Sequence, residues 1–163
     1  MFGQPIHVDW DDTSLEIVNQ TVLKKYCSLI HGQPVLEAVL DLKRGNGLVA
    51  ANTKCIHCDV FQGAFDFAGG GRYGSKDHPQ AKEQADYNLK YLIAAALLDD
   101  QVGPAQLQPA RIQAPDAQAL LARVEVRPDE SPLIIPKSLM PESRSPRKTS
   151  GFLLKNNWAT RAA

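Results

Sequence analysis

The sequence has few cysteines, no excess of charge of either sign and no long apolar run. It contains three cysteines in 163 residues, and this odd number in a chain of this size argues against a secreted disulfide framework. Eighteen basic residues balance eighteen acidic ones, so no overall field favours nucleic acid or an anionic membrane. No apolar run approaches the ~18 residues of a membrane span, and the first residues do not resemble a secretion signal. We therefore expect a cytoplasmic protein with reduced thiols and with no nucleic-acid or membrane partner.

The hydrophobic content, 44% of residues, is enough for one ordinary core. Helical spacing of apolar residues predicts a helix over 34–43, a long helix that starts near Pro79, and a shorter helix over 116–123. β-branched residues and alternation predict strands over 15–25, over 48–67 as two strands or one bent strand, and from Val124. Strands interleaved with helices indicate an α+β fold.

The composition changes after Glu130. Residues 131–163 carry six basic side chains against Glu142 alone, and four prolines interrupt them without a regular period. We therefore divide the chain into a folded domain over 1–130 and a basic, loosely ordered tail over 131–163.

Two short motifs admit a functional reading and a plainer one. The glycines from Gly69 to Gly74 have the spacing of a dinucleotide-binding loop, but Ser75 to His78 separate them from the next predicted helix, so a flexible turn is the preferred interpretation. Cys55, His57 and Cys58, with Cys27 and His31 elsewhere, contain soft metal ligands. On a strand, however, residues three apart face opposite sides, which favours ordinary thiols over a metal site.

His31 is the strongest candidate for chemistry. It stands near Gln33, Lys24 and Lys25, where a predicted strand gives way to a helix. Lysines neutralise a carboxylate substrate and a histidine transfers a proton near neutral pH, although a helix-capping histidine beside surface lysines is the plainer alternative. Asp86 and Tyr91, on the predicted long helix, read as structural residues when taken alone.

Two blocks of the chain are similar to a known family. Residues 24–38 resemble a segment of 2-methylcitrate dehydratases, members of the MmgE/PrpD family, in which an aromatic residue precedes a histidine, a small residue, a glutamine and Glu-Ala. Residues 82–99 resemble the family stretch that reads Ala-Asp-His-Ser, then leucine, tyrosine and an apolar helix, except that Tyr87 replaces the usual histidine. The resemblance covers about residues 8–130, which correspond to the family's C-terminal portion.

The resemblance implies a small α+β lid-type domain with an antiparallel sheet packed against two or three helices. It implies a hydro-lyase of propionate metabolism that acts on di- or tricarboxylic acids without a metal or other cofactor, and that is incomplete without the family's helical domain. The residues assigned to catalysis are His31, Lys24 and Lys25, and those assigned to substrate binding are Gln33, Asp86 and Tyr91. The expected partners are a small carboxylic acid, a helical domain supplied in trans and a second copy of the chain.

Two alternatives remain open. One is a truncated, non-catalytic remnant that acts as a folded or dimerising module. The other is a thiol- or metal-binding protein that uses Cys27, Cys55 and Cys58.

Overall fold

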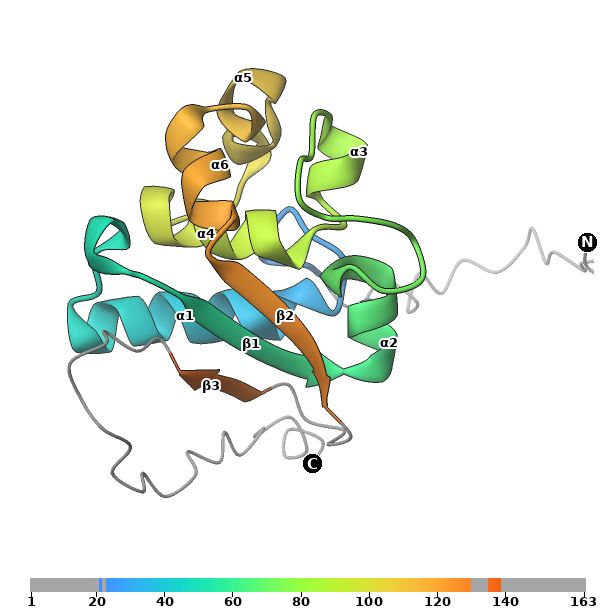
Figure 1. Ribbon diagram of the computed structural model, residues 1–163, viewed down its shortest axis with the longest axis horizontal. Helices are drawn as coiled ribbons and strands as arrows, with labels where there is room; N and C mark the ends of the chain where they lie inside the picture. The colour runs from blue at the N-terminus through green and yellow to red at the C-terminus, as the bar shows by residue number, and fades with distance from the viewer. Residues whose placement is uncertain (1–20, 22, 130–134, 139–163) are drawn as a thin grey trace, which may run out of the picture.

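The computed structural model describes Thr21 and residues 23–129 and 135–138 (Figure 1). The strands are β1 (Ile56–Phe61), β2 (Val124–Asp129) and β3 (Ile135–Ser138). The helices are α1 (Gly32–Asn46), α2 (Gln62–Ala64), α3 (Lys82–Ala85), α4 (Leu89–Asp99), α5 (Pro109–Ile112) and α6 (Pro115–Leu121). Short 3₁₀ helices cover Ala50–Asn52 and Pro104–Leu107, and a π-helical turn covers Phe65–Gly69.

The sheet has the strand order β2-β1-β3 and is not the antiparallel sheet that we expected. β1 and β2 are parallel, with Ile56 opposite Val124 and Phe61 opposite Asp129, and only β3 runs antiparallel to β1. Parallel strands need a long crossover, and residues 62–123 supply one that contains α2 to α6. The broad α+β class is consistent with this arrangement. The antiparallel sheet and the two or three helices were wrong, because six α-helices accompany a parallel pair within the described residues.

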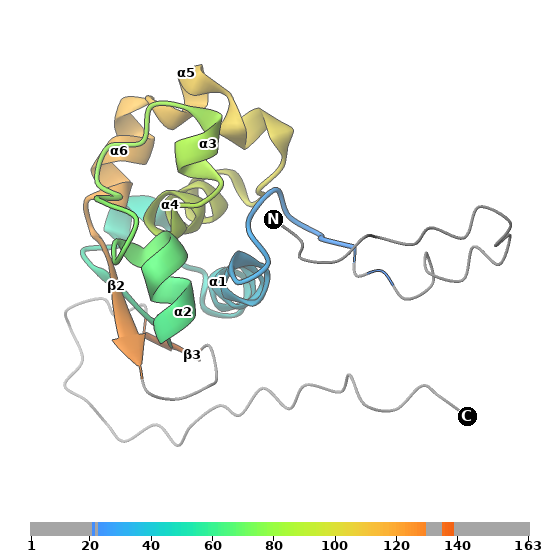
Figure 2. The same cartoon turned by 90° about the vertical axis from the view of Figure 1, so that its right-hand side faces the viewer.

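One face of the β1–β2 pair is covered by helices. Ile56, Cys58 and Val60 of β1 are buried, as are Val124 and Val126 of β2, whereas the residues between them are more exposed. Figure 2 shows α1 and α4 on the covered side. Alternate side chains of the two strands therefore point into the core and away from it.

α1 confirms the helix predicted over 34–43 and extends it at both ends. Val35, Leu36, Val39 and Leu40 are buried at the three- and four-residue spacing of an amphipathic helix. The helix ends at Gly47, whose φ of 61° is left-handed and whose N–H donates to the Lys43 carbonyl. The left-handed conformation explains why a glycine follows the last helical residue.

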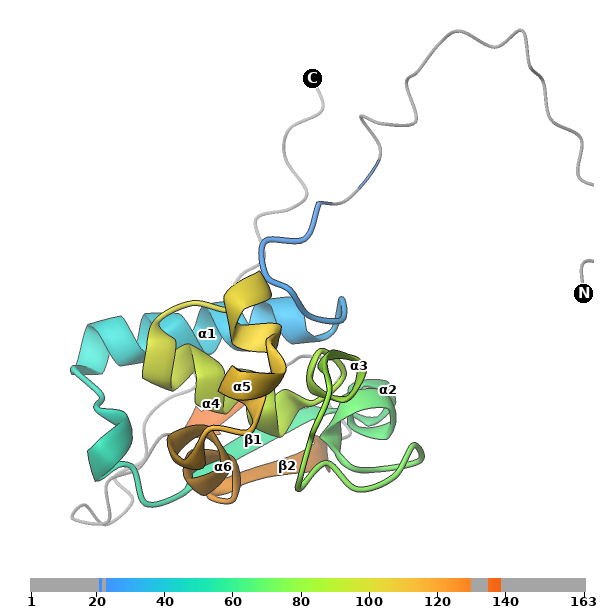
Figure 3. The same ribbon diagram turned by 90° about the horizontal axis from the view of Figure 1, so that it is seen from above.

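α4 lies at the centre of the molecule, between α1 and α6 (Figures 1 and 3). Its residues from Leu89 to Leu97 are buried except Lys90, so it is apolar almost all round. The single long helix that we predicted from Pro79 is wrong, because the chain forms α3, breaks, and starts again as α4. The Asn88 side chain accepts a hydrogen bond from the Tyr91 N–H at 3.0 Å and so caps the second start.

The segment 48–67 forms only one strand, β1, and this also corrects the prediction. Val49 precedes a 3₁₀ helix, and Phe65 and Phe67 lie in the helical segment after β1. The spacing of Phe61, Phe65 and Phe67 among small residues suits a strand, but Phe65 and Phe67 belong to the helical turn that follows β1.

The remaining predictions divide into those that the structure confirms and those that it does not describe. α6 and β2 confirm the helix over 116–123 and the strand from Val124, whereas α5 was not predicted. Most of the strand expected over 15–25 lies outside the described residues, and 23–25 are not in a strand. Ile135–Ser138 of the proposed tail form β3, and the rest of the tail is outside the described part. Within that part, no helix is both long and apolar enough to cross a bilayer.

Candidate functional site

The Gln33 side chain anchors the loop that precedes α1. Its Oε1 accepts hydrogen bonds from the backbone N–H groups of Lys25 and Tyr26, each at 3.0 Å. Its Nε2 donates to the Tyr26 carbonyl at 2.9 Å and to the Ser28 Oγ at 2.8 Å. These bonds use both ends of the amide, so Gln33 sets the conformation of residues 25–28 in this structure.

Lys25 is paired with Glu37 on the exposed side of α1. Its Nζ lies 2.8 Å from the Glu37 Oε2, which also accepts a hydrogen bond from the Tyr26 hydroxyl at 2.6 Å. The hydrogen bond from Lys25, followed by that from Tyr26, lowers the pKa of the Glu37 carboxyl. Gln33 and Glu37 are four residues apart and so lie on the same side of α1, where both contact this loop.

Lys24 takes a different position from its neighbour. Its Nζ donates to the Ser28 carbonyl at 3.0 Å, and it forms no ion pair with a described residue. The side chain is exposed and its charge is therefore available to an anion.

His31 stands immediately before α1, at the N-cap position, but its side chain does not cap the helix. Its side chain accepts no capping hydrogen bond, and its backbone is already helical, with φ −69° and ψ −19°. Neither ring nitrogen has a hydrogen-bond partner among the residues that the structure describes. The plainer interpretation, a helix-capping histidine, is therefore not supported.

Two aromatic rings lie beside His31 and a third stacks on one of them, and together with His31 we call them the aromatic patch: His31, Phe61, Phe67 and Tyr73. The imidazole meets Phe61 edge to face with centroids 4.9 Å apart, and the Phe67 centroid is 6.4 Å away. Phe67 in turn stacks on Tyr73 at 5.2 Å. Phe67 and Tyr73 remain 44% and 57% exposed, which is unusual for large aromatic side chains.

Asp86 follows α3 and is joined to the same loop through its backbone, because its carbonyl accepts a hydrogen bond from the Leu29 N–H at 3.2 Å. The carboxylate is mostly buried. Its Oδ2 lies 3.1 Å from the Lys82 Nζ, while its Oδ1 is buried without a hydrogen-bond partner. Such an unsatisfied acceptor is costly and calls for a missing donor.

Tyr91 lies in the core of the molecule, away from solvent. It is completely buried on α4, and its hydroxyl donates to the Gln106 carbonyl. Burial raises the pKa of the Tyr91 hydroxyl to about 12. The predicted site residues thus divide into a group on and beside the loop before α1, and Tyr91, which is buried in the core on α4.

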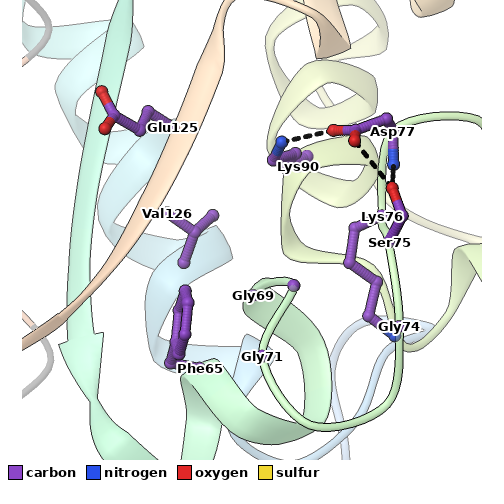
Figure 4. Close-up of a pocket in the computed structure, with 11 residues that line it drawn as sticks. Phe65, Gly69, Gly71, Gly74, Ser75, Lys76, Asp77, Lys90, Glu125 and Val126 are labelled. Carbon is purple, nitrogen blue, oxygen red and sulfur yellow. Dashed lines mark hydrogen bonds and ion pairs between the residues drawn. The ribbon is translucent and has the colours of Figure 1, made fainter.

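The glycine-rich segment forms the expected turn. Gly70 and Gly74 have φ values of 111° and 89°, and no helix starts between Gly74 and Lys82, so a phosphate would not meet a helix N-terminus here. The turn borders an open pocket of about 510 Å³. Its lining includes the Lys90–Asp77 pair at 2.6 Å and Lys76, whose pKa burial lowers (Figure 4).

The cysteines do not converge. Cys58 points into the core, and burial raises the pKa of its thiol to about 12. Cys55 and His57 lie on the other side of β1, with Sγ and Nε2 3.4 Å apart, while Cys27 precedes α1 and is hydrogen-bonded to Val102 through its backbone. Among the described residues, these side chains therefore do not form one ligand set.

The sequence predicted a site at His31 and its loop but did not indicate the residues that surround them. Glu37 was detectable from its helical spacing to Gln33. The aromatic patch was not, because Phe61, Phe67 and Tyr73 meet His31 only through the turn after β1.

The comparison with protein families agrees with the resemblance described above. The family model of the MmgE/PrpD C-terminal domain matches residues 26–145. A comparison with curated proteins finds no match to this chain. The matched range contains β1, β2, the whole of α1 to α6 and every predicted site residue from Tyr26 onwards.

Proposed function

The chain belongs to the MmgE/PrpD family as a C-terminal domain, and from this premise we propose that it is the lid domain of a hydro-lyase of the 2-methylcitrate dehydratase type. The substrates proposed are di- and tricarboxylic acids, and no cofactor is required. A cytoplasmic location fits such a metabolic role and the free thiols of Cys27, Cys55 and Cys58.

One observation carries the proposal: His31 presents two unpartnered ring nitrogens within an exposed aromatic patch. Dehydration of a hydroxy acid starts with removal of a proton next to a carboxylate. An imidazole that is held by Phe61, and is not committed to a helix cap, is suited to accept that proton.

The charges around His31 favour an anionic substrate. His31 stands at the N-terminus of α1, a 15-residue helix whose dipole places partial positive charge there, and the first turn contains no acidic residue. Lys24 supplies a cation without a carboxylate partner in the described part. Lys25 can bind a substrate only when its ion pair with Glu37 opens. We therefore propose Lys24 as the main cation for the substrate and Lys25 as a weaker one.

The proposed substrate-binding residues have unequal roles. Asp86 offers the buried and unpartnered Oδ1, which a substrate hydroxyl would satisfy. The side chains of Gln33 and Tyr91 are already hydrogen-bonded to the Tyr26 and Gln106 carbonyls. We propose that they stabilise the site and do not contact the substrate directly.

The site needs groups beyond those proposed here. Elimination of water requires a base for the proton, an acid for the hydroxyl and cations for two or three carboxylates, all within reach of one molecule. His31 supplies the base, and Lys24 supplies one of the cations. We propose that a helical domain of the same family supplies the others and excludes water across the aromatic patch.

The test is binding of 2-methylcitrate, citrate and cis-aconitate to the whole chain, followed by thermal unfolding and by NMR of the histidine rings. At a ligand concentration ten times Kd the free energy of unfolding should rise by about 1.4 kcal/mol. His31→Gln should abolish this gain. His78→Gln replaces an exposed histidine outside the aromatic patch and should retain it.

The isolated chain should not turn over these acids at a measurable rate. Turnover that is lost in His31→Ala would support the site and refute its incompleteness. Equal binding by wild type and His31→Gln would reject the site itself.

A further inference from the structure

Cys55, His57 and Glu125 form a second cluster, at the end of β1 opposite the aromatic patch. The Cys55 Sγ lies 3.4 Å from the His57 Nε2, and the His57 Nδ1 lies 3.1 Å from the Glu125 Oε2. Nδ1 is buried and is oriented off the ideal hydrogen-bond direction toward this carboxylate. The imidazole thus stands between a thiol and a carboxylate.

The sheet itself produces this arrangement. Cys55 and His57 are two residues apart on extended backbone and so share a side of β1, away from the core. The parallel register places His57 directly opposite Glu125 on β2. Arg127, two residues further along β2, holds the Glu125 Oε2 at 2.5 Å.

The order thiol, imidazole, carboxylate is that of an activated nucleophile with a base and a group that orients the base. A carboxylate at Nδ1 favours the tautomer with its proton on that nitrogen, which leaves Nε2 free to accept one. We propose that Cys55 is a reactive thiol that exchanges with low-molecular-weight disulfides, with His57 as its base and Glu125 as a positioning residue.

The exchange is balanced without any added oxidant. His57 Nε2 accepts the proton of the Cys55 thiol, and the sulfur attacks one sulfur of the disulfide. A bond forms between Cys55 and that sulfur as the original S–S bond breaks. The second sulfur leaves as a thiolate and takes the proton from His57, so one mixed disulfide and one free thiol replace one thiol and one disulfide.

This site is independent of the proposed lid function. Cys55 precedes β1 and Phe61 ends it, and six residues of strand span about 20 Å. None of the residues assigned to the carboxylic-acid site belongs to the thiol cluster. Failure of either proposal therefore leaves the other untouched.

The cysteines of the chain provide an internal comparison. Cys58 is three residues after Cys55 in the sequence but is buried in the core. It should not react, because burial raises the pKa of its thiol to about 12. Cys27 is half-buried like Cys55, and its loop precedes α1 rather than β1. A difference in reaction rate between the Cys27 and Cys55 thiols would therefore be due to the groups around each thiol and not to exposure alone.

The experiment treats the reduced full-length chain with oxidised glutathione and follows each cysteine by peptide mass spectrometry over time. Cys55 should be modified first. His57→Gln should slow modification of Cys55 by about tenfold or more, because general-base assistance is lost. His78→Gln, the same change at an exposed histidine, should leave the rate unchanged.

Glu125 is tested by a pair of variants. Glu125→Gln keeps an oxygen acceptor for Nδ1 and should retain most of the rate, whereas Glu125→Ala should lose severalfold, with circular dichroism confirming the fold of both. Equal modification of Cys27 and Cys55 in the wild-type chain would overturn the proposal without any variant. An unchanged rate in folded His57→Gln would overturn it as well.

Discussion

Gln33 illustrates how a residue of the predicted site can act through the backbone. Its amide joins the Lys25 and Tyr26 N–H groups to the Ser28 hydroxyl, and so fixes the loop that leads to His31. The sequence pointed to this position through its place beside His31 and through the family resemblance. Whether its amide atoms are free to bind substrate depends on the conformation of residues 25–28. The residues next to Gln33 in the sequence do not determine that conformation.

Gln33→Ala should therefore lower the free energy of unfolding by about 1–3 kcal/mol, because it leaves the part-buried Tyr26 N–H without its partner. It should also weaken citrate binding by displacing His31. Urea unfolding and the binding assay measure the two effects. Gln101→Ala, at an exposed position, should change stability by less than about 0.5 kcal/mol. Unaltered stability in Gln33→Ala would show that the loop is held by other contacts.

At the scale of elements, periodicity identified α1 and α6 but not the limits of the helices around α4. Ala85, Leu89, Leu92 and Ile93 continue one apolar face, so the pattern runs through a break that Asn88 makes. Apolar spacing reports which side chains are buried. It does not report whether the backbone between them stays helical. A buried asparagine is compatible both with one continuous helix and with two helices, the second of which it caps.

The end of α4 is joined to α5 by an ion pair. The Arg111 Nη2 and Nε lie 2.8 and 2.9 Å from the two Asp99 oxygens, and both side chains are about four-fifths buried. The hydrogen bonds from Arg111 lower the pKa of the Asp99 carboxyl. A lowered carboxyl pKa gives stability that is present above the unfolded value, near 3.9, and is lost as pH falls through the folded value.

Asp99→Asn should thus destabilise the protein by about 1–3 kcal/mol at neutral pH. The difference from wild type should begin to shrink below about pH 4, where the unfolded wild-type carboxyl takes up a proton, and should disappear only as pH falls through the lowered folded-state pKa. Urea unfolding at pH 7 and pH 3 tests this. Asp41→Asn, in an exposed pair with Arg44, should have little effect at either pH. A penalty that is equal at both pH values would assign the effect to packing.

At the scale of the whole molecule, the direction of the strands in the sheet could not be predicted from the sequence. Alternation in β2 predicted a strand, but strand direction depends on where the chain goes between β1 and β2. The intervening helices return the chain to the same end of the sheet, which makes the pair parallel. The family resemblance was correct, while the antiparallel sheet attached to it was not.

The exposed aromatic patch predicts self-association of the isolated chain. Phe67 and Tyr73 stack with 44% and 57% of their surfaces exposed, and Ile30 beside His31 is 51% exposed. Apolar groups clustered in this way gain free energy when another surface covers them. If a helical domain normally covers the patch, a second copy of the chain is the available substitute when that domain is absent.

Sedimentation equilibrium should therefore show a dimer that forms as concentration rises. Phe67→Asp combined with Tyr73→Asp should abolish it, because two carboxylates cannot be buried there without partners. Tyr87→Asp is the matched control, since Tyr87 is 49% exposed but lies outside the patch, and it should still dimerise. A monomer at all concentrations would show that the patch is stable in water and would weaken the case for a covering domain. Dimerisation that survives the double substitution would place the contact on another face, and the aromatic patch would then remain open to substrate in the dimer.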